Sequence, residues 1–294
     1  LSPEFNADSA YTYIEKQLSF GHRIPNQPAH KKCAAWMVEK FKSLGCEVSI
    51  QNATVTAYDG TKLQIQNIIA ATNPKATRRM MVAAHWDSRP WADQDPDPAK
   101  HKTPILAAND AGSGVAVMME MARVMQAKNP EIGVDFFLWD AEDYGKGEVE
   151  NSFCLGSQHW ARNKHKKDYK AELGFNLDMV GADGAVFYGD QKSIKGAGYS
   201  TKKLWEIGNE IGYGNLFSYV ESPALIDDYI YVMEIGGVPT TEVIDRRLNS
   251  TTGDFDFCPT WHTMKDDLSG ISKTTLKAVG QVLLEFVYRE KPAS

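Results

Sequence analysis

Two short apolar runs with an amphipathic stretch between them constrain the fold of this chain more than any other feature. The runs are residues 80–84 (Met-Met-Val-Ala-Ala) and 134–139 (Val-Asp-Phe-Phe-Leu-Trp), and apolar side chains recur at helical spacing over residues 112–126. A strand, a helix and a second strand in this order predict two parallel strands that are buried on both faces. We therefore expect a central sheet with helices on either side.

The same patterns continue through the rest of the chain. Helical spacing over residues 8–19 and 28–44 predicts two opening helices, and the changed period over residues 48–55 and 63–69 predicts a pair of strands. Buried-strand patterns follow at residues 173–179 and 238–244, with further helices expected at about residues 156–163, 200–212, 226–235 and 271–289. The predicted fold class is α/β, a three-layer sandwich with a central mixed, mostly parallel sheet.

No internal repeat, low-complexity tract or flexible linker divides the sequence, so residues 1–294 are predicted to form a single domain. Two long polar segments, residues 89–104 and 246–259, are rich in Asp, Pro, Gly and Thr. Both are predicted to be surface loops. Loops of this length in a compact domain often form a functional site.

Charge and cysteine content narrow the range of partners. A net charge of -6 offers no basic stripe for a phosphate backbone, so we expect no nucleic-acid partner, and no apolar run approaches the length needed to span a membrane. A small or peptidic partner is expected instead. The four cysteines lack the paired short spacing of a zinc knuckle and are expected as buried thiols, with one disulfide possible: Cys33, Cys46, Cys154 and Cys258.

Polar residues follow the predicted strands at the positions where ligands bind in open α/β sheets, beyond the carboxyl ends of the strands. A single acid after a strand is often only the N-cap of the next helix. A group of carboxylates and imidazoles is different, because like charges gathered at one sheet edge need a cation to neutralise them, and this mixture of ligands suits zinc. The group comprises His85, Asp87, Asp110, Asp140, Glu142, Asp143, Asp178 and His262.

Five segments in this order resemble the M28-type zinc aminopeptidase superfamily, to which the animal-type glutaminyl cyclases also belong. The resemblance runs from about Phe20 to Val287 and includes residues 20–26 (Phe-Gly-His-Arg-Ile-Pro-Asn). The segments are residues 84–88 (Ala-His-Trp-Asp-Ser), 108–114 (Ala-Asn-Asp-Ala-Gly-Ser-Gly), 140–143 (Asp-Ala-Glu-Asp), 177–181 (Leu-Asp-Met-Val-Gly) and 261–264 (Trp-His-Thr-Met). The resemblance implies a zinc exopeptidase-like fold and a catalytic domain.

The resemblance implies two alternative sets of zinc ligands. In the aminopeptidases two zinc ions would be held by His85, Asp110 as the bridge, Asp143, Asp178 and His262, with Glu142 as the base. In the cyclases a single Zn2+ per chain would be held by Asp110, Asp143 and His262. Glu142, Asp178 and Asp227 would then form a catalytic acid group beside it. Because the sequence retains every ligand type, the ligands alone do not choose between these activities.

Three features favour the cyclases. Trp261 directly precedes His262, as in the cyclase pocket where an indole covers the substrate side chain. Asp227 precedes Asp228 where the aminopeptidases usually have serine, and residues 20–25 match the cyclases. The pair Glu142-Asp143 replaces the usual Glu-Glu pair, and the tryptophan that the animal enzymes carry shortly after the pair is missing, which suggests a bacterial relative.

The sequence is therefore interpreted as a glutaminyl-peptide cyclotransferase, an acyltransferase that cyclises the N-terminal glutamine of peptides or proteins to pyroglutamate and releases ammonia. The alternative is an M28-type di-zinc aminopeptidase. A non-catalytic relative that keeps the fold as a binding surface would have lost ligands, whereas this sequence retains them. The chain begins without an initiator methionine, so either a signal peptide was removed or the chain was trimmed. Together with the resemblance, this start predicts a periplasmic or secreted location. The protein is expected to be a monomer.

Overall fold

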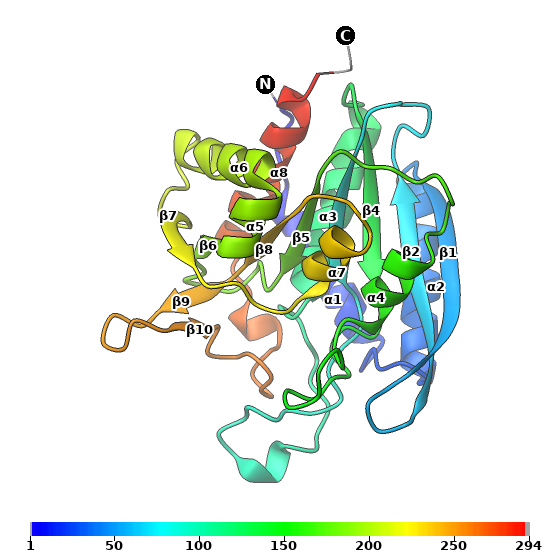
Figure 1. The fold of residues 1–294 in the computed structure, drawn as a ribbon, viewed down its shortest axis with the longest axis vertical. Helices are drawn as coiled ribbons and strands as arrows, with labels where there is room; N and C mark the ends of the chain where they lie inside the picture. Colours follow the sequence, from blue (N-terminus) through cyan, green and yellow to red (C-terminus); the bar gives the residue numbers. More distant parts are fainter. Residues whose placement is uncertain (1, 292–294) are drawn as a thin grey trace.

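A six-stranded mixed sheet runs through the centre of the computed structural model, which describes residues 2–291 (Figure 1). The strand order is β1-β2-β4-β3-β5-β8, and β4, β3, β5 and β8 run parallel, whereas β2 is antiparallel to β1 and β4. The predicted mixed, mostly parallel sheet is confirmed. The strand bounds are β1 Glu47–Thr56, β2 Lys62–Ala71, β3 Arg79–His85, β4 Gly133–Trp139, β5 Gly174–Asp178 and β8 Thr240–Ile244.

The predicted strand–helix–strand unit forms as β3, α3 (Gly112–Ala127) and β4, and the two strands are parallel. Alternate residues of β3 face opposite sides of the sheet, as the pleat requires. Val82 and Ala84 pack in the core beneath α3, whereas Met81 and Ala83 pack with Trp160 in a second core on the other face. Burial on both faces explains why the run lacks polar residues.

Helices cover both faces of the sheet and give the three layers. The first face carries α1 (Ala7–Ser19), α2 (Pro28–Ser43), α3 and α8 (Lys273–Arg289). The second face carries α4 (Leu155–Arg162) and α7 (Asp228–Glu234), which lie in front of the sheet in Figure 1. The helix α6 (Gly198–Glu210) packs against α8. These helices agree with the predicted ranges to within a few residues.

The sequence of the last helix, α8, determines where the helix begins and which of its faces is buried. The side chain of Ser272 accepts a hydrogen bond from the amide of Thr275 and caps the N-terminus of α8. The apolar stripe predicted for this helix is buried against the first core, which orients the helix on the sheet: Leu276, Val279, Leu283, Phe286 and Val287.

Several short elements were not predicted. Residues 187–196 form β6 (Phe187–Asp190) and α5 (Gln191–Gly196), and β7 (Phe217–Ser222) pairs with β6. The prediction of a loop throughout residues 246–259 was wrong, because β9 (Arg246–Leu248) and β10 (Phe255–Phe257) pair there as a hairpin that projects from the body in Figure 1. Two single-turn 3-10 helices, η1 (Pro98–Lys100) and η2 (Leu268–Gly270), complete the described elements.

The arrangement of the loops places the functional site. The segments that follow β3, β4 and β8 leave the sheet at the carboxyl ends of these strands, on the side opposite the two chain termini (Figure 1).

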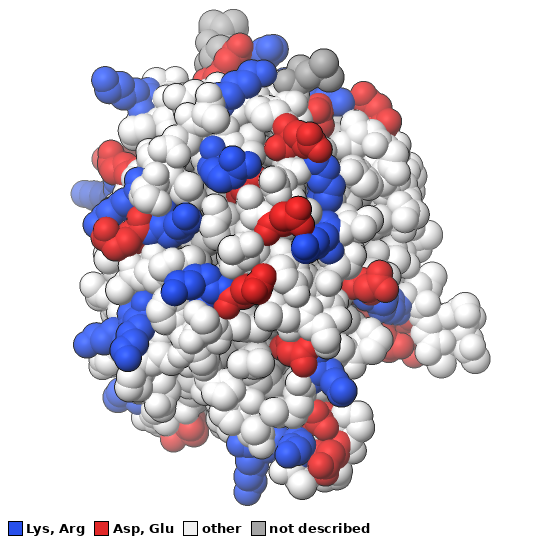
Figure 2. Space-filling view, turned by 180° about the vertical axis from the view of Figure 1, so that it is seen from behind, with Lys and Arg blue, Asp and Glu red and all other residues white. Residues whose placement is uncertain are grey.

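The charged side chains, the cysteines and the helices bear on the partners expected from the sequence. On the face opposite to the view of Figure 1, acidic and basic side chains are interspersed (Figure 2). All four cysteines are buried and free. Among the described residues, no helix has both the length and the apolar character to cross a membrane.

Candidate active site

The polar residues singled out in the sequence meet beyond the carboxyl ends of the parallel strands. Each of them is less than a tenth exposed. The elements that position them are β3 for His85, the turn before α3 for Asp110, the turn after β4 for Glu142 and Asp143, β5 for Asp178, the N-cap of α7 for Asp227 and the loop after β10 for His262. Segments far apart in the sequence thus supply one compact site.

Three of these residues form a set with the spacing of zinc ligands. The Nε2 atom of His262 lies 3.4 Å from Asp110 Oδ2 and 3.3 Å from Asp143 Oδ2. Ligand atoms bound to a tetrahedral zinc ion at about 2.0–2.1 Å lie about 3.3–3.4 Å from one another. Asp143 Oδ2 is also buried without a hydrogen-bond partner in the described structure. The residues present therefore fit one zinc ion, and three protein ligands leave its fourth position open for chemistry.

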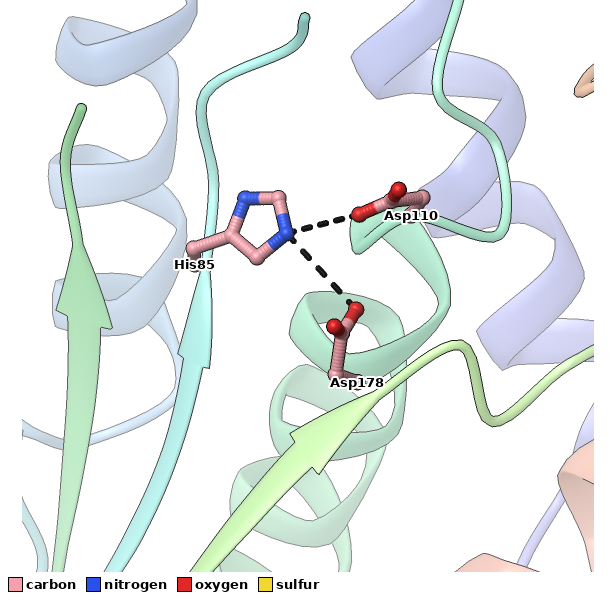
Figure 3. Close-up of side chains that lie close together, drawn as sticks. All are labelled: His85, Asp110 and Asp178. Atoms are coloured by element: carbon pink, nitrogen blue, oxygen red, sulfur yellow. Dashed lines mark hydrogen bonds and ion pairs between the residues drawn. The ribbon is translucent and has the colours of Figure 1, made fainter. Parts of the chain in front are cut away.

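His85 makes different contacts, and its ring points toward Asp110 and Asp178 (Figure 3). Its Nε2 atom is 2.8 Å from Asp110 Oδ1 and 3.6 Å from Asp178 Oδ1, and its Nδ1 atom is 3.3 Å from Asp87 Oδ1. Burial disfavours the charged imidazole, but the contacts with the carboxylates of Asp110, Asp178 and Asp87 outweigh it and raise the pKa of His85 well above its usual value. The atoms of His85, Asp110 and Asp178 are also close enough to share a metal ion.

A group of carboxyls with raised pKa values adjoins the proposed ligands. Burial, followed by the charges of Asp143 and Asp227, raises the pKa of Glu142 well above its usual value, although His85 opposes the shift. Burial and the charge of Asp110 raise the pKa of Asp178 to about 7. Burial and the charge of Asp178 also raise the pKa of Asp227. Carboxyls that exchange protons near neutral pH are suited to proton transfer.

A cavity of about 400 Å³ opens over the acid group and the three proposed ligands. Trp261 forms part of its wall and stacks on His262, with the ring centroids 4.0 Å apart, and its other ring neighbour is Phe257 at 4.5 Å. Leu225 and Ile226 extend the apolar wall. The site therefore combines an apolar wall with a polar floor, an arrangement typical of small-ligand pockets.

A second cavity, of about 440 Å³, lies around Arg79 and Tyr169 at the opposite end of β3. Its buried charges are already paired, because Arg79 forms an ion pair with Asp135 at 2.6 Å and Tyr169 donates a hydrogen bond to the same carboxylate at 2.9 Å. The cavity over the acid group is therefore the candidate active site.

Further buried residues hold the site together, and the sequence reasoning missed two of them. Asp87, which it included, accepts hydrogen bonds from the amides of Glu142 and Asp143 at 3.0 and 3.1 Å. Asp266, which it missed, accepts hydrogen bonds from the amides of Asn109 and Asp110. Arg89 was assigned to a surface loop, but it is buried and contacts Asp143. Nothing in the sequence distinguishes these two residues from solvated loop residues.

Comparison with known proteins places the chain in a family. The model of peptidase family M28 matches residues 67–287. The chain belongs to peptidase family M28. The recognition made from the five segments is confirmed, and so is the zinc exopeptidase-like fold. The family identifies this M28 protein as an enzyme and implies zinc as its metal.

Solved structures resemble this M28 protein over nearly its whole length. A zinc-dependent exopeptidase from Parabacteroides distasonis is 43% identical with a TM-score of 0.95, and the match covers 99% of this chain and 100% of that one. The glutaminyl cyclase of Tannerella forsythia is 45% identical with a TM-score of 0.94, and the match covers 98% and 100% of the two chains.

Curated relatives of the M28 protein are more distant and longer. Aminopeptidase YwaD from Bacillus subtilis is 28% identical over 254 residues, which are 81% of this chain and 47% of that protein. The chain thus spans about half the length of this relative. The similar proteins include both a glutaminyl cyclase and an aminopeptidase, so the choice between these two activities depends on the chemistry of the site.

Proposed function

We propose that this M28 protein is a glutaminyl-peptide cyclotransferase that converts the N-terminal glutamine of peptides to pyroglutamate and releases ammonia. The observation that carries the proposal is the contact between His85 Nε2 and Asp110 Oδ1, at 2.8 Å. This is a hydrogen-bond distance, and it is shorter than the separation of about 3.3 Å expected between two ligand atoms on one zinc ion. His85 therefore makes a hydrogen bond where a second metal would otherwise bind, which supports one zinc ion per chain.

The chemistry of cyclisation matches the groups that line the site. The α-amine of glutamine must attack its own side-chain carbonyl, forming one C–N bond while the bond to the side-chain nitrogen breaks. Zinc held by Asp110, Asp143 and His262 would supply a Lewis acid that polarises this carbonyl. Trp261 covers the apolar part of the side chain and holds it folded, so that the amine and the carbonyl carbon stay close.

The acid group supplies the proton transfer that this reaction needs. Glu142 takes a proton from the attacking α-amine and delivers it to the departing nitrogen, which leaves as ammonia. Burial raises the pKa of Glu142, which makes the carboxyl a stronger proton acceptor for the first step. Asp227, which accepts a hydrogen bond from Asn176 at 3.3 Å, and Asp178 lie beside Glu142, where they orient the amine and keep the pKa of the group high.

The second candidate is a di-zinc aminopeptidase. It is favoured by the group formed by His85, Asp110 and Asp178, whose atoms lie within 4.8 Å of one another and could hold a second ion. In that case Glu142 would take a proton from a water molecule that attacks the peptide bond. Asp178 would then act as a metal ligand instead of a member of the acid group.

Zinc stoichiometry and product analysis on one preparation test the proposal. Zinc per chain is measured alongside ammonia release from a glutaminyl dipeptide, with a leucyl dipeptide as the hydrolysis substrate. The variant Glu142→Gln serves as the matched control, because it should keep the fold and the zinc while losing most of the turnover. About one zinc per chain, with ammonia and a pyroglutamyl product, supports the cyclase. About two zinc ions, with free amino acid and no ammonia, would make the protein an aminopeptidase.

Location and assembly are part of the same proposal. We propose a periplasmic or secreted monomer produced from a precursor with a signal peptide, because this accords with the resemblance to the cyclases. Fractionation of cells that express the complete gene tests the location, and light scattering on the eluted protein tests the mass. Recovery in the cytoplasmic fraction, or a mass of about two chains, would contradict the corresponding part.

A further inference from the structure

Arg89 connects the surroundings of two proposed zinc ligands, although neither the sequence nor the mechanism assigns it a role. It lies four residues after β3, and only 4% of its side chain is exposed. Its Nε and Nη2 atoms donate to the two oxygens of Asp93 at 2.7 and 2.8 Å. Its Nη1 atom donates to Asp143 Oδ1 at 3.0 Å and to the Asp143 carbonyl at 3.1 Å. One guanidinium group therefore bridges two carboxylates.

The bond to Asp143 determines which of its oxygens faces the metal position. Arg89 engages Oδ1, and Oδ2 is left without a hydrogen-bond partner, 3.3 Å from His262 Nε2. Asp143 is thereby presented to a metal ion through one oxygen only.

Asp93 extends the effect of Arg89 to the ligand His262. Asp93 Oδ1 lies 3.3 Å from His262 Nδ1, an ion-pair contact that lacks the alignment of a hydrogen bond. A carboxylate on this side of the ring favours the proton on Nδ1 and leaves Nε2 free for a metal. The next residue, Gln94, donates its amide to the carbonyl of His262 at 3.1 Å, so this segment also fixes the backbone of the ligand.

We propose that Arg89 is a positioning residue that sets the zinc affinity of the site. It holds Asp143 directly and fixes the Asp93 carboxylate beside His262, and Asp110, the third proposed ligand, is held independently by His85. The inference rests on the zinc centre proposed above, but it does not depend on whether the enzyme cyclises or hydrolyses.

The positive charge of Arg89 and its positioning of the ligands would affect zinc affinity in opposite directions, so a measurement of zinc affinity distinguishes the two effects. If only the positive charge mattered, removing it would relieve repulsion of a zinc ion and tighten binding. If Arg89 positions the ligands, its loss weakens zinc binding by about 10- to 100-fold, as for other residues that orient metal ligands. Arg89→Met removes both the positive charge and the planar guanidinium group that donates to two carboxylates. Arg89→Lys keeps the charge but cannot bridge two carboxylates with one compact ammonium group.

The test measures zinc dissociation constants by competition with a chromophoric chelator. We expect both Arg89→Met and Arg89→Lys to bind zinc about 10- to 100-fold more weakly than the wild type. Arg79→Lys is the matched control: Arg79 makes the same two-nitrogen contact with Asp135, at 2.9 and 2.6 Å, but at the other end of β3. Its zinc affinity should equal that of the wild type, whatever its effect on stability.

Two further measurements keep the test decisive. Asp93→Asn preserves side-chain shape and should weaken zinc binding in the same direction even if an Arg89 variant folds poorly. In cobalt-loaded protein, loss of Arg89 should weaken the visible absorption bands, because Asp143 becomes free to bind through both oxygens and raise the coordination number. Zinc binding by folded Arg89→Met as tight as in the wild type would overturn the inference. Failure of the wild type to bind zinc would instead overturn the proposed zinc centre.

Discussion

Replacing Glu142 with glutamine is the sharpest perturbation of the proposed mechanism, because it removes the ionisable oxygen and little else. The amide of Glu142 donates to Asp87 Oδ1 at 3.0 Å, and its carbonyl accepts from the amide of Cys154 at 2.8 Å. Both bonds belong to the backbone and survive the change. The Cys154 thiol donates to Glu142 Oε1 at 3.3 Å, and a glutamine oxygen can accept the same bond. The fold and the proposed ligands should therefore remain in place.

The expected loss follows from the role of Glu142 in moving protons. General acid–base catalysis contributes about 10²–10⁴-fold to a rate, which corresponds to about 2.7–5.4 kcal/mol of the activation barrier. We expect kcat to fall by this factor in Glu142→Gln while KM changes little, since Trp261 and the proposed zinc ligands are untouched. Ammonia release from a glutaminyl dipeptide measures the rate, and metal analysis of the same sample measures bound zinc.

The pH dependence gives the same prediction a second readout. Glu142 accepts the proton of the amine only when it is ionised, so activity falls as the pH drops below its pKa. Because burial raises that pKa, the acid limb of the wild-type profile should lie above the usual range of glutamate. The limb should be lost from the residual activity of Glu142→Gln. Near-native activity with zinc bound would refute the proton-transfer role, and loss of zinc from the variant would show a ligand role instead.

Four other perturbations test separate parts of the reasoning. Trp261→Ala should raise KM about tenfold in initial-rate assays with the fold intact, because an aromatic contact to the substrate is lost, and an unchanged KM would make it a packing residue. His262→Ala should lose both bound zinc and turnover, so full zinc occupancy would remove it from the ligand set. Stripping zinc with a chelator should lower the thermal midpoint, since zinc at a hundredfold excess over its dissociation constant adds about 2.7 kcal/mol, and an unchanged midpoint would contradict binding to the folded state. Gly114→Ala should destabilise the fold by about 1–3 kcal/mol in urea, because the added carbon would lie 2.7 Å from the Leu177 carbonyl and 2.8 Å from Ala84 Cβ, and an unchanged urea midpoint would contradict this close packing.

The parts of the fold that the sequence predicted are those with a long or fully apolar period. The run that became β3 could be predicted because burial on both faces removes polar residues from it, and α8 because its stripe recurs over several turns. The strands β9 and β10 have three residues each, too few to show a period. Their hairpin is held partly by Arg246, which packs over the ring of Phe257 at 4.9 Å, a contact that exists only after folding.

The residues of the site also differ in whether the sequence could predict them. The position of an acid or histidine at the end of a strand is encoded locally, so His85, Asp143 and Asp178 could be placed at one edge of the sheet from the sequence. The resemblance to a family was needed for Asp227 and Trp261, because both lie on segments whose approach to that edge depends on tertiary folding. Arg89 and Asp266 could not be found by either route, since a buried charged residue in a polar segment looks like a solvated one until its partners are known.

The number of metal ions and the protonation of the acid group are two solutions to one electrostatic problem. One zinc ion would leave several buried carboxylates near Asp110 to be balanced by protons, and the raised pKa values of His85 and Asp178 favour protons on these two groups. A second zinc ion would balance them instead, and Asp178 would then be ionised as a ligand. Protons held by carboxyls can be transferred during a reaction, whereas charge neutralised by a metal cannot. A site that keeps its protons is thus suited to the internal proton transfer of cyclisation, and a site that exchanges them for a second metal is suited to activating water.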